Sequence, residues 1–166
     1  MSLENLPTLP IDSQGKTLVD STWSPLRCEK LITFTGGTAN TWGDHDGTAD
    51  GGSLFTVTGT VRMRIIGIVE TTLVGDSGTV EVGVTGSTAG LLAQVVGTTM
   101  VAGEIWHDAT VDAKFEVSTV AIENIIANGI DPILTVATAN ITAGAIRFLV
   151  SWYPMSAGAL VVPSSN

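Results

Sequence analysis

Hydrophobic and polar residues alternate most regularly between Thr60 and Thr85. Residues two apart on a β-strand share a face. In the first run the apolar face holds Val61, Met63, Ile65, Gly67, Val69 and Leu73. The opposite face is polar except at Ile66 and Ile68. In the second run the apolar positions are Val80, Val82 and Val84. The residues between the runs, 75–78, are Gly-Asp-Ser-Gly and suit a reversing loop, so the pattern predicts a long antiparallel hairpin with one buried face.

A second alternating pair closes the chain. Residues 132–138 form one apolar run, residues 140–144 have turn composition, and residues 145–153 return. In the returning run the apolar face is Ile146, Phe148, Val150 and Trp152. We therefore expect a second hairpin there, which ends at Pro154 because proline cannot donate to a ladder.

Shorter elements lie between these pairs. Residues 31–35 form a short strand by composition, residues 104–108 are a short aromatic-bearing segment, and Gly59 marks a bulge or a bend between two sheets. Residues 88–94 fit either a short helix or a turn and strand. Residues 114–120 alternate, with Phe115 and Val117 inward. Residues 121–128 fit a helical turn or a strand, and a strand before the Asn128-Gly129 turn is favoured.

Several short strands with turn signals, and no strand–helix alternation, predict an all-β fold: a single antiparallel β-sandwich or jelly-roll-like domain over residues 31–154. Residues 1–30 contain Pro7, Pro10 and Pro25 and scattered leucines, so we expect an extended arm. It is expected to lie across its own domain or a neighbour; a disordered tail is the alternative. Residues 155–166 are expected to form an extended tail.

Composition narrows the partners. Only 14% of the 166 residues are charged, against roughly 25% in an average domain, so a homo-oligomer or a permanent attachment is expected. The net charge of −9, with no basic run, argues against nucleic acid and anionic membranes. Without a signal-peptide pattern or a long apolar stretch, cytoplasmic synthesis is expected.

The loop of residues 36–52 carries the one cluster with metal-like spacing: Asp44, Asp46 and Asp50. Alternating aspartates can ligate calcium. However, the glycine directly follows the second aspartate, and no glutamate closes the loop as the calcium-loop pattern requires. An acidic surface loop is the favoured interpretation, with no bound metal.

Catalytic signals are weak. His107 and Asp108 are sequence neighbours, His45 is the other histidine, and Cys28 is the single cysteine, without protease-type surroundings. We expect no catalytic residue, no cofactor and no enzymatic activity. The four tryptophans, which could stack on sugars or anchor a core or an interface, are Trp23, Trp42, Trp106 and Trp152.

Several segments together carry a family resemblance: Leu31–Asn40, the Asp-Gly loop before Leu54–Gly59, Val80–Val84, Glu104–Ala109 and Asn140–Gly144. They resemble small virion structural proteins of tailed bacteriophages. The resemblance implies a capsid decoration (cement) protein: a compact β domain, often a homotrimer, on the capsid exterior, bound to the major capsid protein and present in the host cytoplasm during assembly. The alternative is a tail- or fibre-associated β-sandwich module that contacts a glycan or receptor.

Overall fold

The computed structural model describes residues 25–37, 41–45, 52–113, 123–127 and 129–165. Within them the chain is all-β, with one short 3-10 turn, η2 (Gly97–Thr99). The strands are β1 (Leu26–Thr33), β2 (Phe55–Thr58), β3 (Val61–Gly75), β4 (Thr79–Val84), β5 (Ser87–Val96), β6 (Glu104–Trp106), β7 (Val111–Ala113), β8 (Asn124–Ile126), β9 (Ile133–Ala137), β10 (Ile141–Pro154) and β11 (Leu160–Pro163).

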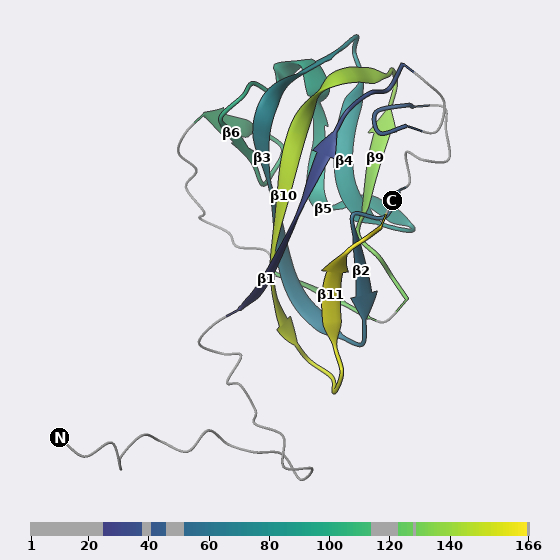
Figure 1. Ribbon diagram of the computed structural model, residues 1–166, viewed down its shortest axis with the longest axis vertical. Helices are drawn as coiled ribbons and strands as arrows, with labels where there is room; N and C mark the ends of the chain where they lie inside the picture. The colour runs from purple at the N-terminus through teal and green to yellow at the C-terminus, as the bar shows by residue number, and fades with distance from the viewer. Residues whose placement is uncertain (1–24, 38–40, 46–51, 114–122, 128, 166) are drawn as a thin grey trace, which may run out of the picture.

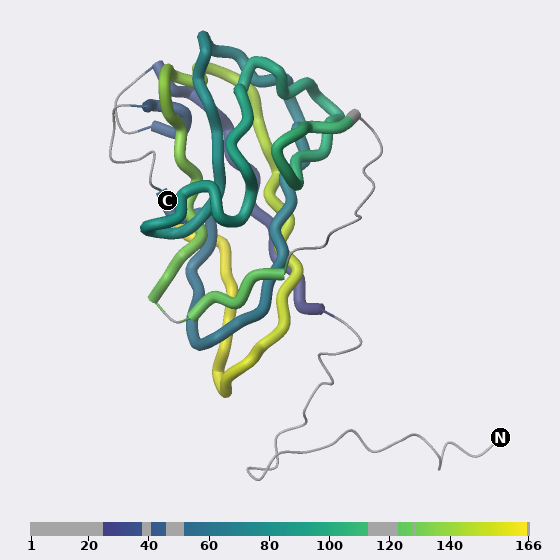
Figure 2. Tube along the Cα trace, turned by 180° about the vertical axis from the view of Figure 1, so that it is seen from behind, coloured from purple at the N-terminus to yellow at the C-terminus, as the bar shows by residue number. Residues whose placement is uncertain are grey.

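The strands form antiparallel sheets that pack against each other as a sandwich. The large sheet has the order β1-β10-β3-β6-β7, with β8 paired to one end of β3. The facing layer consists of a three-stranded sheet, β5-β4-β9, and a two-stranded sheet, β11-β2. Figures 1 and 2 show the three-stranded sheet toward one end of the molecule and the two-stranded sheet toward the other. The predicted all-β sandwich is therefore confirmed.

The predicted faces of β3 and β10 are also confirmed. Along β3 the buried positions are Val61, Met63, Ile65, Gly67, Val69 and Leu73. On β10 they include Ile146, Phe148, Val150 and Trp152. On β4 the predicted faces hold only in part: Val80 and Val82 are 0% exposed, but Glu81, predicted on the polar face, is buried and Val84 is half-buried. One continuous hydrophobic core thus fills the space between the layers.

The pairing predicted for these strands is wrong. β3 belongs to the large sheet and β4 to the three-stranded sheet, so residues 75–78 cross the sandwich instead of closing a hairpin. The second predicted hairpin fails in the same way, because β9 pairs with β4 while β10 pairs with β1 and β3. A strand that buries one face shows the same alternation in either arrangement. The two crossings touch: a Cβ added at Gly75 would clash with the Asn140 carbonyl oxygen.

A true hairpin joins β4 and β5 through Thr85 and Gly86, so residues 88–94 are strand and not helix. Gly59 has a φ of 70° and separates β2 from β3, which confirms the predicted bend between sheets. The strand favoured before Asn128 is present as β8, and the aromatic-bearing segment at 104–108 contains a strand that was not predicted, β6. Residues 114–122, including Phe115 and Val117, and Asn128 lie outside the described residues.

The domain extends beyond its predicted limits at both ends. β1 begins at Leu26, within the predicted arm, and pairs with β10 over its whole length. β11 lies within the predicted tail and pairs with β2, where Val161 is 3% exposed. Residues 1–24 of the predicted arm lie outside the described residues. Both strands owe their place to long-range pairing, which composition does not reveal.

Candidate interaction surface

The chain's four arginines, Arg27, Arg62, Arg64 and Arg147, all lie on the outward face of the large sheet. The register explains their proximity. Arg27 on β1 and Arg64 on β3 are both partners of Ser151 on β10. The even-numbered positions of β10, such as Val150 and Trp152, point into the core. Ser151 and its partners therefore point away from it. A chain with a net charge of −9 thus places every arginine on one face.

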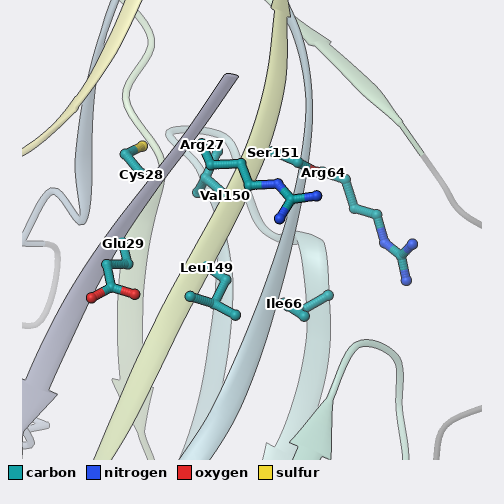
Figure 3. A pocket seen from close by; sticks show the side chains of 8 residues that line it. All are labelled: Arg27, Cys28, Glu29, Arg64, Ile66, Leu149, Val150 and Ser151. Atoms are coloured by element: carbon teal, nitrogen blue, oxygen red, sulfur yellow. The ribbon is translucent and has the colours of Figure 1, made fainter. Parts of the chain in front are cut away.

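A shallow hollow of about 590 Å³ lies between Arg27 and Arg64. Its lining includes Leu149 on β10 and Ile66 on β3, which are themselves aligned through the Glu29–Leu149–Ile66 row. Figure 3 shows the Arg27 side chain lying across β10, with Leu149 and Ile66 beside it. The hollow thus combines an apolar floor with a cationic rim. We call this region the arginine face, defined by Arg27, Glu29, Arg64, Ile66 and Leu149.

Arg147 and Arg62, at the two ends of this sheet face, have acidic partners. Arg147 Nε lies 2.6 Å from Glu70 Oε1, and its NH1 nitrogen lies 3.0 Å from Glu29 Oε1. The hydrogen bond from Arg147 to Glu70 is the main cause that raises the pKa of Arg147. Arg62 Nε lies 3.1 Å from Glu123 Oε2, and its guanidinium stacks 4.6 Å from the Tyr153 ring centre.

Arg27 and Arg64 differ from these two. Neither makes an ion pair with a residue that the structure describes. Glu29, the carboxylate of the arginine face, is engaged by Arg147. Two positive charges therefore stand beside an apolar floor. This combination suits a carboxylate-bearing apolar ligand, because guanidinium groups bind carboxylates in a bidentate manner.

Other exposed apolar side chains are spread over the described surface. The large ones are Leu26, Leu31, Val74, Val96, Val101, Ile125, Ile130, Met155, Leu160 and Val162. Ile125 is 65% exposed and lies opposite Arg62 in the register of β8 and β3. Single exposed apolar residues are ordinary on any protein. Here Ile125 and Leu31 extend the outward face that carries the arginines.

The histidine candidates have structural surroundings. His107 Nδ1 lies 3.7 Å from Asp108 Oδ2. Asp108 Oδ1 accepts hydrogen bonds from the Thr110 backbone NH at 2.7 Å and hydroxyl at 2.8 Å. These bonds lower the pKa of Asp108. They also hold the turn between Asp108 and Thr110, which gives this carboxylate a structural role. The His45 backbone NH donates to Asn140 Oδ1 at 2.9 Å, which ties the 36–52 loop to the connection between β9 and β10.

Cys28 is poorly suited to nucleophilic chemistry. It lies on β1 and is half-buried. Burial raises the pKa of the Cys28 thiol to about 11. Because the thiolate is the reactive form, this thiol stays protonated and weakly reactive at neutral pH.

The aspartate loop is only partly described. Asp44 is 5% exposed, while Asp46 and Asp50 lie outside the described residues. In the part of the chain that the structure describes, no three His, Cys, Asp or Glu side chains gather as metal ligands would. The predicted surface loop thus has at least one aspartate turned away from solvent.

Two tryptophans are core residues and offer no stacking platform for a sugar. Trp106 is 0% exposed and Trp152 is 3% exposed. Trp106 Nε1 donates to the carbonyl oxygens of Ala93 at 3.2 Å and Asp108 at 3.1 Å. This satisfies its polar atom within the core, so core anchoring is confirmed for both.

Trp42 is half-buried and packs against the core. The Lys30 ammonium lies 5.2 Å from its ring centre, which occupies one face of the indole. Trp23 lies outside the described residues.

The arginine face was missed by sequence reasoning. Its signal was present in Ile66 and Ile68, the apolar exceptions on the outward face of β3. Joining them to Arg27 and Leu149 requires the β1–β10–β3 register, which local pattern does not supply.

No helix among the described residues has the length and apolarity needed to span a membrane.

Comparison with known proteins gives no match: no family model, no curated protein and no solved structure is similar to this chain.

Proposed function

We propose that the protein is a structural virion protein that binds the outer surface of a bacteriophage head as a decoration (cement) protein. In this role it forms a homo-oligomer, a trimer in the favoured form, and bridges subunits of the major capsid protein. Its work is binding and not catalysis. The proposal joins the family resemblance of the sequence with the surface chemistry of the sandwich.

The observation that carries the proposal is the low charge of the chain, 14% of its residues, together with the large apolar side chains exposed on its surface. Large side chains such as Leu31, Ile125 and Leu160 are 48%, 65% and 48% exposed. Burying apolar surface contributes roughly 25 cal/mol per Å². A surface of this kind, with few charges to desolvate, suits permanent contacts with other subunits.

The overall charge is compatible with a place outside the shell. A net charge of −9 disfavours contact with packaged DNA, whose binding depends on lysine and arginine. A protein that prefers the assembled shell stabilises it by mass action, by about 4 kcal/mol per site at a thousandfold excess over the dissociation constant.

The test compares particles with and without the protein. Purified protein is first examined by light scattering, and an oligomer is expected. It is then added to heads that lack it, and their disruption temperature is expected to rise. Negative-stain images should show added density on the outer surface.

A monomer that leaves the heads unchanged would contradict the proposal. Binding of the same monomer to a glycan array would favour the tail- or fibre-associated module. For that role Trp106 and Trp152 are unsuitable because both are buried.

A further inference from the structure

We propose that the arginine face is the binding site for an extended apolar segment that carries carboxylates, and that its occupant is residues 1–24 of a neighbouring copy of this chain. The inference rests on the proposed function in one respect, namely that the protein forms an oligomer. It adds which surface receives the contact and which segment makes it.

The arginine face presents positive charge beside exposed apolar surface. Arg27 and Arg64 are two guanidiniums without an ion-pair partner among the described residues. They flank the half-exposed side chains of Ile66 and Leu149 in a hollow of about 590 Å³. An extended peptide could lay alternate apolar side chains on this floor and present its carboxylates to the rim.

Residues 1–24 combine acidic and apolar side chains. Residues 1–24 contain three acids, Glu4, Asp12 and Asp20, against one base, Lys16. Their apolar residues include Leu3, Leu6, Leu9, Ile11, Leu18 and Val19. In the stretch Leu9-Pro10-Ile11-Asp12 a leucine and an isoleucine alternate with proline and are followed by a carboxylate. Proline disfavours a helix there and favours an extended backbone.

The segment is long enough to reach a neighbouring copy. At about 3.3 Å per residue, a 24-residue segment spans up to roughly 80 Å, which is enough to reach a neighbour. The chain enters β1 at Leu26, directly beside Arg27. This reach and the oligomer of the proposed function together assign the segment to a neighbouring copy.

A second copy of the arginine face is a poor occupant, because it would set like charges against each other. An acidic segment of the neighbour gives charge complementarity instead. The contact is heterologous, since a segment of one copy meets a sheet face of the next. Such contacts close into rings when the rotation permits, which agrees with the proposed trimer.

Photocrosslinking tests the site directly on the full chain. A benzophenone amino acid replaces Ile66 in unlabelled protein, which is mixed with nitrogen-15 protein and irradiated. Crosslinked peptides that join position 66 to the nitrogen-15 form of residues 1–24 are expected. The matched control places the same group at Thr135, a half-buried position on the other sheet, and should not capture the segment.

Charge exchange tests the ionic part. The double substitution Arg27→Glu and Arg64→Glu should weaken self-association at least about tenfold, because two charge-assisted contacts are lost. Adding Glu4→Lys, Asp12→Lys and Asp20→Lys to the same chain should restore association. Thr56→Glu with Thr88→Glu, two exposed sites outside the large sheet, adds negative charge elsewhere and should leave association unchanged.

The outcomes separate the two proposals. An oligomer whose crosslinks from position 66 reach other regions, or remain within one copy, overturns this inference and leaves the decoration role standing. Mixed-isotope crosslinks and a working charge exchange, in a protein that does not stabilise heads, support this inference and overturn the decoration role. A protein that stays monomeric at all concentrations overturns this inference.

Discussion

Gly67 on β3 and Trp106 on β6 are register partners, and a Cβ atom at Gly67 would lie 3.2 Å from Trp106 Cε3. The same Cβ would lie 3.2 Å from Ile146 Cγ2 on β10. The missing side chain therefore leaves the space that the largest fully buried residue of the core occupies.

We predict that Gly67→Val destabilises the fold by overpacking, by about 1–3 kcal/mol. Urea unfolding followed by tryptophan fluorescence measures the change. Gly37→Val is the matched control, because a Cβ at Gly37 meets no atom within 4 Å. Equal stability of the two variants would contradict the packing around Trp106.

Val82→Asp should lower the free energy of unfolding by about 3 kcal/mol or more, because a carboxylate would be buried without a partner. Val82 is 0% exposed and faces the core from β4. Val74→Asp introduces the same group at a position that is 54% exposed. Thermal melting should therefore separate the two variants clearly, and coincident melting curves would disprove the assigned strand phase.

Cys28 should react slowly with iodoacetamide in the folded protein at pH 8 and faster as the pH approaches 11, since its pKa is raised to about 11 by burial. The denatured protein is the control and should react faster at pH 8. The raised pKa of Cys28 also makes the stability of the fold depend on pH. The unfolded thiol ionises at a lower pH, so this group's contribution to stability is present below the unfolded pKa and is lost as pH rises toward 11. A native rate equal to the denatured rate at pH 8 would show an accessible, unshifted thiol.

Lys30 connects β1 to the end of the chain. Its Nζ donates to the Ser164 carbonyl oxygen at 3.1 Å and to the Ser53 carbonyl oxygen at 3.3 Å. Lys30→Met keeps the side-chain stem but removes these donors, and we expect a loss of about 1–2 kcal/mol. Hydrogen exchange should show weaker protection of β11, while Thr33→Met, an exposed position on β1, should not. Unchanged protection in both variants would show that the Lys30 contacts do not hold β11.

Sequence pattern predicted the buried faces of β3 and β10 and did not predict which strand pairs with which. The apolar residues expected to face the core, from Val61 to Val69 on β3 and from Ile146 to Trp152 on β10, are buried because side-chain direction is a local property. The main partner of β3 is β10, which begins more than sixty residues further along the chain. The crossing at 75–78 has the composition of a reversing turn, so the local signal was ambiguous.

The candidate surface was hidden for the same reason. Ile66 and Ile68 signalled that the outward face of β3 is not an ordinary solvated face. The prolines and scattered leucines of residues 1–30 place Arg27 in an expected arm, whereas its strand exists through pairing with β10. Composition could place four arginines in the chain but could not bring them to one face.

The pairing of β1 has a mechanical consequence. All eight residues of β1 are paired antiparallel with β10, and β10 is paired in turn along most of its length with β3. A pull on Leu26 that is directed along the strand axis loads these pairs together in shear and does not peel them one at a time. Tension applied in this way is transmitted directly to the longest pair of strands. The domain therefore resists unfolding most strongly when the force acts along the strand axis.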